Sequence, residues 1–233
     1  MQLYRSGCLI CGDELVYSEN HANTCIMCGR KFRSEVKCKN GHFVCDECHS
    51  APAEALIDKM CSASSEQNPL KLAQEIMAYN AIKIHGPEHH FLVAACLLVC
   101  YANTTGQIEN IKPWVQIAKQ RSRKLPGGFC GSHGNCGAAV ATGIFVSVMS
   151  NATPLSGREW QLSNLMTAKS LYTIAIAGGP RCCKRDTFIA IREAQAFIIE
   201  YFEVELPINE TIICEYVQMN GQCTLSDCEF FKN

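Results

Sequence analysis

Eight potential metal ligands occupy the first fifty residues in four closely spaced pairs. The pairs are Cys8 and Cys11, Cys25 and Cys28, Cys38 and His42, and Cys45 and Cys48. Thiolate and imidazole ligands at such short spacings are typical of tetrahedral zinc sites, and eight of them suffice for two ions. Because the segment holds few large apolar residues, we expect bound metal to supply most of its folding free energy.

The four pairs can share two zinc ions in two ways. In a cross-braced arrangement the first and third pairs bind one ion, and the second and fourth pairs bind the other. In a sequential arrangement the first two pairs form a zinc ribbon and the last two pairs a second site. Segment 38–48 resembles the central part of RING fingers, which favours the cross-brace of a RING-like or treble-clef module. Such a module is expected to bind a protein partner.

Two adjacent cysteines, Cys182 and Cys183, stand between a helix stop and a helix start. Residues 178–180 are Gly-Gly-Pro, which is typical of a helix end, and a helical apolar pattern begins near Asp186. A helix N-terminus and the basic neighbours in the run 181–185 favour thiolate over thiol. We therefore predict that both cysteines are nucleophiles or metal ligands.

Further cysteines lie in a glycine-rich loop and in the C-terminal tail. The loop, residues 126–139, runs into a helix, and its exposed amides are suited to an anion or to the sulfides of a cluster. Three tail cysteines lack a fourth partner nearby in sequence, so an iron–sulfur cluster would need one thiolate from elsewhere. Zinc and a purely structural role are the alternatives. The candidate cluster ligands are Cys130, Cys136, Cys182, Cys183, Cys214, Cys223 and Cys228.

The turn at residues 85–90 carries a third kind of chemistry. His85, Glu88 and His89 have the H-x-x-E-H spacing of some zinc peptidases, but Gly86 and Pro87 interrupt the helix which that motif needs. A polar site at a pocket rim fits better, with Glu88 and His89 joining Cys182 and Cys183 as candidate catalytic residues.

Composition limits the class of protein. The chain has 233 residues with 17 cysteines and a net charge of −1, so nothing points to nucleic acid or to an anionic membrane as partner. The longest apolar run, residues 91–100, is too short to cross a bilayer. No apolar targeting segment follows Met1. We expect a cytoplasmic, reducing and anaerobic setting in which cysteines serve metals or redox chemistry.

Helical periodicity dominates the chain after residue 50, which predicts a mainly all-α protein with a small N-terminal two-zinc module. The expected helices are 52–60, 70–84, 87–101, 111–123, 135–149, 157–177 and 186–202, and the third of these should be central. The expected organisation is a zinc module (1–50), a connecting helix and linker (51–68), an all-α domain (69–207) and a cysteine-bearing tail packed on that domain (208–233).

Two resemblances bear on function. Cys130, the run 136–139, Gly143 and the Cys182–Cys183 pair resemble the C-GCAxxG-C-C family of redox or iron–sulfur proteins, although the spacing from Cys130 to Cys136 differs. The wider pattern is similar to a domain family of unknown function from anaerobic archaea and bacteria. Members of that family occur joined to radical SAM or methyltransferase domains, which implies anaerobic metalloenzyme chemistry.

The combined expectation is a metal-cysteine protein of anaerobic metabolism. It would bind two zinc ions and an iron–sulfur cluster or redox-active thiols, and act in redox reactions, sulfur transfer or metalloenzyme maturation. This interpretation requires Cys130, Cys136, Cys182 and Cys183 to converge on one site. One alternative is a non-catalytic zinc-dependent adaptor. Another is an accessory of methyl transfer or hydrolysis, in which His85, Glu88 and His89 face the same cavity as Cys182.

Overall fold

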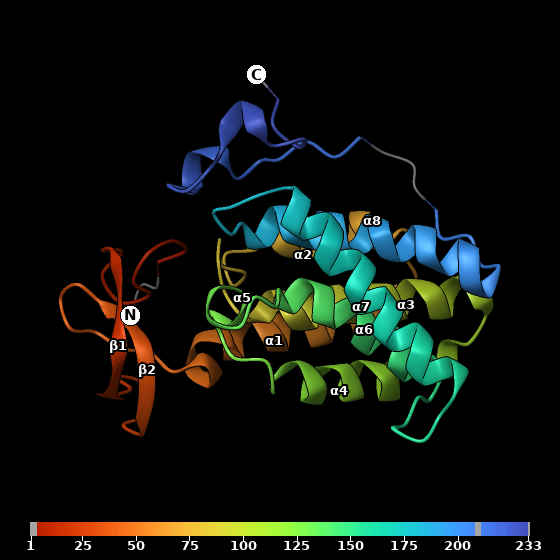
Figure 1. The fold of residues 1–233 in the computed structure, drawn as a ribbon, viewed down its shortest axis with the longest axis horizontal. Helices are drawn as coiled ribbons and strands as arrows, with labels where there is room; N and C mark the ends of the chain where they lie inside the picture. Colours follow the sequence, from red (N-terminus) through yellow and green to blue (C-terminus); the bar gives the residue numbers. More distant parts are fainter. Residues whose placement is uncertain (1–3, 208–210, 233) are drawn as a thin grey trace.

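A computed structural model of the chain describes residues 4–207 and 211–232. A cysteine-rich module with a two-stranded hairpin lies at one end, a bundle of helices forms the body, and the C-terminal tail runs over the bundle (Figure 1). The expected fold class, a mainly helical protein with a small N-terminal module, is confirmed to this extent.

The module is built on a hairpin that the sequence analysis did not predict. Strand β1 (Leu15–Thr24) pairs antiparallel with β2 (Lys31–Cys38), with an irregularity between Tyr17 and His21. The hairpin buries almost nothing. In the range 4–45, the fully buried side chains are those of Cys8, Leu9, Cys25, Cys38 and Cys45. Four of these five are cysteines, so the module has ligands where an ordinary domain has an apolar core.

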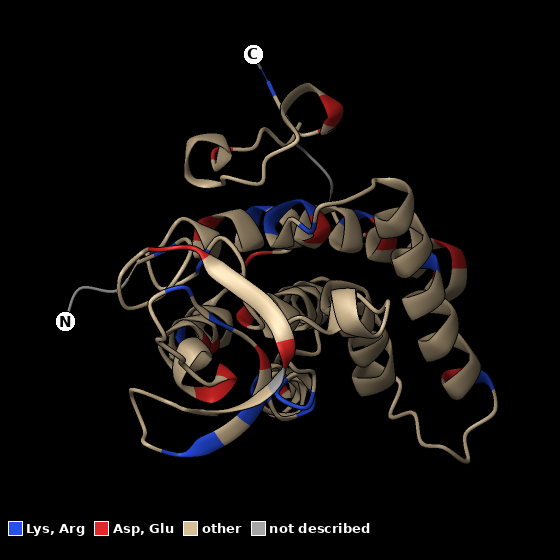
Figure 2. Cartoon of the chain, turned by 60° about the vertical axis from the view of Figure 1, so that its left-hand side comes forward, with Lys and Arg blue, Asp and Glu red and all other residues tan. Residues whose placement is uncertain are grey.

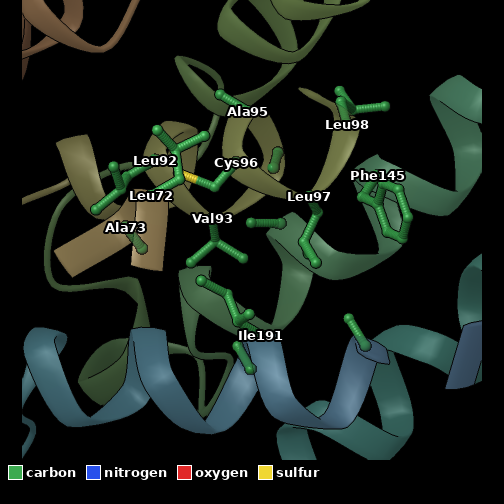
Figure 3. Packing of buried hydrophobic residues seen from close by; sticks show 14 of the residues in the cluster. Leu72, Ala73, Leu92, Val93, Ala95, Cys96, Leu97, Leu98, Phe145 and Ile191 are labelled. Carbon is green, nitrogen blue, oxygen red and sulfur yellow. The ribbon is translucent and has the colours of Figure 1, made fainter. Parts of the chain in front are cut away.

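Eight α-helices follow in the described chain. They are α1 (Asp46–Ala63), α2 (Pro69–Met77), α3 (Glu88–Thr105), α4 (Ile111–Ser122), α5 (Phe129–Ser132), α6 (Gly137–Met149), α7 (Arg158–Ile176) and α8 (Cys183–Phe202). Helix α3 is buried on all sides and contacts α1, α2, α4, α6 and α8, which confirms its predicted central place. Figure 3 shows its Cys96 and Leu97 packed among residues of neighbouring helices, including Phe145 of α6 and Ile191 of α8.

Helix α1, which the sequence analysis expected to be only a connecting helix, is part of the helical core. It is longer than expected, and its Ala53, Ile57 and Cys61 are fully buried in the same core as α3. The polar linker does separate α1 from α2. There Asn68 caps α2 by accepting hydrogen bonds from the backbone N–H groups of Leu70 (3.0 Å) and Lys71 (3.2 Å).

Helix α2 ends at Met77, seven residues before its predicted end. The guanidinium of Arg5 donates hydrogen bonds to the carbonyl oxygens of Met77 (3.2 Å) and Ile82 (3.3 Å). Arg5 thus satisfies one carbonyl at the end of α2 and one in the turn that follows it. Ile82 and Ile84 remain buried, but in a turn instead of a helix.

Over its described part the tail contacts α8. The rings of Phe188 and Phe230 lie 5.3 Å apart between centroids, and Arg192 pairs with Glu229 at 2.7 Å. The expected start of the tail, at residue 208, lies outside the described residues. The segment has two short 3₁₀ turns, Val217–Met219 and Leu225–Asp227, and is otherwise irregular.

Charged side chains do not concentrate on one element. Figure 2 shows lysines and arginines interspersed with aspartates and glutamates over the helices and the hairpin. None of the helices in the described ranges is long and apolar enough to cross a membrane.

Candidate functional site

The eight N-terminal ligands form two compact groups. One comprises Cys8, Cys11, Cys38 and His42, and the other Cys25, Cys28, Cys45 and Cys48; within each group all ligand atoms lie within 4.8 Å of one another. The sulfurs of Cys11 and Cys38 are 3.6 Å apart, and those of Cys28 and Cys45 3.8 Å. A tetrahedral zinc ion with bonds of about 2.3 Å sets its sulfurs about 3.8 Å apart. Each group therefore fits one metal ion, in the alternating arrangement and not the sequential one.

Two matching turns present the first ligand pair of each group. The backbone N–H of Gly12 donates to the carbonyl of Cys8 (2.7 Å), and that of Gly29 to Cys25 (2.8 Å). Both glycines have positive φ, 76° and 71°, which side-chain-bearing residues rarely adopt. The N–H of Cys45 also donates to the sulfur of Cys25 (3.4 Å). These turns bring the sulfurs of each pair together, and the N–H of Cys45 stabilises the thiolate form of Cys25 that binds a cation.

One cysteine in each group is predisposed to ionise. A backbone N–H from Asp13 is the main cause that lowers the pKa of Cys11 to about 6. Hydrogen bonding from the Arg30 side chain is the main cause that lowers the pKa of Cys28 to about 6. Each group thus offers a thiolate near neutral pH, which is the form that binds metal.

Four other cysteines line a small cavity between α8 and the tail. They are Cys182, Cys214, Cys223 and Cys228, and the enclosed space is about 20 Å³. Three of the sulfurs accept hydrogen bonds, from the N–H of Tyr216 to Cys214 (3.4 Å), the N–H of Leu225 to Cys223 (3.4 Å) and the amide of Asn220 to Cys182 (3.5 Å). Among the described residues, no three of these sulfurs meet the mutual 4.8 Å spacing of the module groups. The tail supplies three of the four thiols, and α8 the fourth.

A buried cation stands beside this cavity. Lys184 is 0 % exposed, and its Nζ has no hydrogen-bond partner among the described residues. Its Nζ lies 4.6 Å from the ring centroid of Tyr216, which lines the cavity. Burial lowers the pKa of Lys184 to about 7. The sequence analysis counted Lys184 among the basic neighbours of Cys182 and Cys183 but did not predict its burial.

A cleft of about 650 Å³ lies between the module and the N-terminal ends of α3, α6 and α8. Its lining includes many of the remaining chemical groups that the sequence singled out: Cys130, Cys136, Cys183, His85 and His89. His90 and Asp186 line it as well. The sulfur of Cys136 lies 3.9 Å from Oδ2 of Asp186, so α6 and α8 meet at the cleft floor.

The four cysteines expected at one site are therefore divided. Cys182 lines the tail cavity, whereas Cys130, Cys136 and Cys183 line the cleft. The division arises at the start of α8, where Cys182 is the extended N-cap residue and Cys183 the first helical residue. Neighbouring side chains at such a junction point in different directions, so one cysteine pair serves two cavities.

Burial also overturns the expectation that these thiols are ionised. It raises the pKa of Cys182 and Cys183 and raises that of Cys136 to about 12. The cost of burying a thiolate exceeds the help from the helix N-terminus and the basic neighbours. Without a bound cation, all three are thiols at neutral pH.

Glu88 does not lie at the pocket rim where the sequence analysis expected it. It lines neither cavity. Its carboxylate accepts a hydrogen bond from the N–H of Lys83 (3.0 Å) and lies 3.6 Å from Nδ1 of His49. Burial alone would raise the pKa of Glu88, but the nearby His49 and His89 and the backbone N–H of Glu88 together outweigh it and hold that pKa at about 2. Glu88 is a buried link between α1 and α3, and a shared site with Cys182 is not formed.

The fold and the two ligand groups define a mainly helical protein with a cysteine-rich module able to hold metal ions. The chain belongs to the family of unknown function DUF5714, which matches residues 57–231. The match covers the helices from the second half of α1 onward and the three cysteines of the tail, and excludes the module. Neither the curated proteins nor the solved structures contain a match to this chain.

Proposed function

We propose that this chain is an iron–sulfur protein of anaerobic cytoplasmic metabolism, with two structural zinc ions in its module and a [4Fe–4S] cluster on Cys182, Cys214, Cys223 and Cys228. The cluster would serve redox chemistry, sulfur transfer or metalloenzyme maturation. The observation that carries the proposal is the convergence of these four cysteines, from α8 and the tail, on a single cavity.

The spacing of the sulfurs favours a cluster over a third zinc ion. A single ion needs the short sulfur separations of the module groups, which the tail cysteines lack. A four-iron cluster stands between its thiolates and holds them farther apart. Because the enclosed space is about 20 Å³, loading a cluster requires the irregular tail to move outward.

The charge around the cavity supports an anionic occupant. A [4Fe–4S] cluster with four thiolates carries net negative charge, which would hold the buried amine of Lys184 protonated; that amine has no hydrogen-bond partner among the described residues. The N–H groups of Tyr216 and Leu225 and the amide of Asn220 already point at three of the sulfurs. Donors to cluster sulfurs of this kind stabilise the bound thiolates and tune the reduction potential.

The test is metal analysis of matched cysteine variants, purified without oxygen. Cys214→Ser and Cys223→Ser should lose the iron, the acid-labile sulfide and the visible absorption of the cluster while keeping the zinc. Cys130→Ser, which alters a cysteine of the cleft, should keep the iron, the sulfide, the visible absorption and the zinc. The proposal fails if wild-type protein holds no iron, or if Cys130→Ser loses iron as readily as Cys223→Ser.

A second function, that of an adaptor, is favoured by the module surface. Ile26 and Met27, between two ligands of the second group, are 55 % and 43 % exposed, which suits contact with a protein partner. An Ile26→Ser, Met27→Ser double variant should keep its zinc and lose a partner captured by wild-type protein from anaerobic cells. If the partner is retained, the module surface is not the adaptor site.

A further inference from the structure

The ring of His89 presents an unused nitrogen to the cleft. Its Nδ1 lies 3.1 Å from the carbonyl oxygen of Gly86. A carbonyl can only accept, so Nδ1 carries the proton and Nε2 carries a lone pair. That Nε2 has no hydrogen-bond partner among the described residues, and the side chain is 1 % exposed. A buried acceptor in this state indicates a ligand that the protein chain does not supply.

His85 also has a buried ring nitrogen without a hydrogen-bond partner among the described residues, but it is in the opposite tautomer. Its Nε2 lies 3.2 Å from Oδ1 of Asn220. The same Asn220 atom accepts a hydrogen bond from the backbone N–H of Gln222 (3.0 Å), which identifies it as oxygen. His85 Nε2 is therefore the donor, and Nδ1 has the lone pair. That Nδ1 is buried and also lacks a hydrogen-bond partner in the part of the chain that the structure describes.

A thiol completes the set around the same turn. Cys183, the first residue of α8, lines the cleft together with His85 and His89. Its sulfur lies against the backbone N–H of Gly86, the residue whose carbonyl orients His89. His89 and Cys183 thus both contact Gly86, His85 adjoins it in the chain, and all three residues line the cleft.

We propose that His85 Nδ1, His89 Nε2 and Cys183 Sγ bind a single divalent transition-metal ion. Histidines that ligate metals characteristically donate their other N–H to a carbonyl or carboxylate oxygen. His89 donates in this way to the carbonyl oxygen of Gly86, and His85 donates to the side-chain oxygen of Asn220. Two nitrogens and one sulfur suit zinc, cobalt, nickel or ferrous iron. With three protein ligands, a fourth position opens into the cleft, where a substrate or water can reach the metal.

This site differs from the two module groups in one respect. Its three ligand atoms are not all within 4.8 Å of one another, so the ion must draw them together. We therefore expect weaker and more exchangeable binding than in the module, which is the usual difference between an open catalytic site and a closed structural one. The proposal does not rest on the cluster, since Cys182 and the tail cysteines take no part in it.

The test is equilibrium dialysis of the anaerobically purified full chain against buffered zinc, followed by separate zinc and iron counts. We expect about three zinc ions in wild-type protein and about two in His85→Ala, His89→Ala and Cys183→Ser. His133→Ala is the matched control, because His133 is exposed and does not line the cleft. It should keep about three zinc ions.

Two zinc ions in dialysed wild-type protein would overturn the proposal, and so would a third ion that survives in both histidine variants. If His89→Ala does not fold, His85→Ala, whose side chain is less buried, still decides the question. Cobalt added to wild-type protein gives a second measurement, since its visible bands should report mixed nitrogen and sulfur ligation and vanish in His85→Ala. Iron is counted in the same samples, so loss of the cluster cannot imitate loss of this ion.

Discussion

The side-chain amide of Asn220 donates a hydrogen bond to the sulfur of Cys182 across 3.5 Å. Through its oxygen the same amide accepts a hydrogen bond from His85, at the edge of the cleft. One residue of the tail therefore contacts both cavities. If a cluster is bound on Cys182, Asn220 lies on the short path between that cluster and a molecule in the cleft.

Asn220→Asp should shift the reduction potential of the cluster to more negative values. The substitution keeps the oxygen that accepts from His85 and Gln222, but it replaces the donor to Cys182 with a negative charge. Loss of a hydrogen bond to sulfur and added negative charge both disfavour the reduced cluster. A redox titration monitored by electron paramagnetic resonance measures the shift. An unchanged potential at unchanged iron content would mean that Cys182 is not a ligand.

Lys184→Met should have opposite effects on the empty and the loaded protein. In the metal-free chain, methionine removes a buried amine that has no hydrogen-bond partner in the part of the chain that the structure describes, so we expect a gain in stability of about 1–3 kcal/mol. In the loaded protein it removes a cation beside an anionic cluster, so iron should be lost faster to a chelator. Thermal unfolding of both forms and the rate of iron release test this. Equal effects on the two forms would argue against an anionic occupant.

Removal of zinc should unfold the module and leave the helical body intact. Among the side chains that the structure describes in residues 4–45, Leu9 is the one buried non-cysteine, so little holds this segment together once its ligands are free. Hydrogen exchange with and without a zinc chelator should show fast exchange in β1 and β2 and unchanged protection in α3. Loss of protection in α3 would show that the module and the helices fold as one unit.

Gly143→Ala should destabilise the helical body. An added Cβ on this residue of α6 would lie 2.9 Å from the carbonyl oxygen of Ser163 and would also meet the Thr167 hydroxyl, both on α7. Overpacking of this kind typically costs about 1–3 kcal/mol. Gly131→Ala is the control, because a Cβ there meets nothing within 4 Å. Chemical unfolding compares the two, and equal stabilities would show that α6 and α7 adjust freely.

Local patterns were sufficient to predict most of the helical body and the eight module ligands, whereas the assignment of these ligands to two groups was left open. The periodic apolar residues located α3, α4, α6, α7 and α8 to within a few residues. The short ligand spacings identified all eight module residues. Features that depend on distant residues were missed. Arg5 donates to the last carbonyl of α2 from 72 residues away. The β1–β2 hairpin was missed although β2 alternates Phe32, Val36 and Cys38 with charged residues, because its inner face is only partly buried and β1 lacks such a pattern.

The division of the cysteines was also beyond local patterns. Adjacent positions such as Cys182 and Cys183 look alike in sequence, but the N-cap geometry at the start of α8 and the path of the tail assign them to different cavities. The free nitrogens of His85 and His89 became visible only through their hydrogen-bond partners.

The measurement that tests the central claim most directly is the iron, sulfide and zinc content of wild-type protein purified without oxygen. We predict about four iron and about four sulfide ions per chain, in addition to at least two zinc ions. Zinc without iron or sulfide would contradict the claim, because the four cysteines of the tail cavity would then hold no cluster.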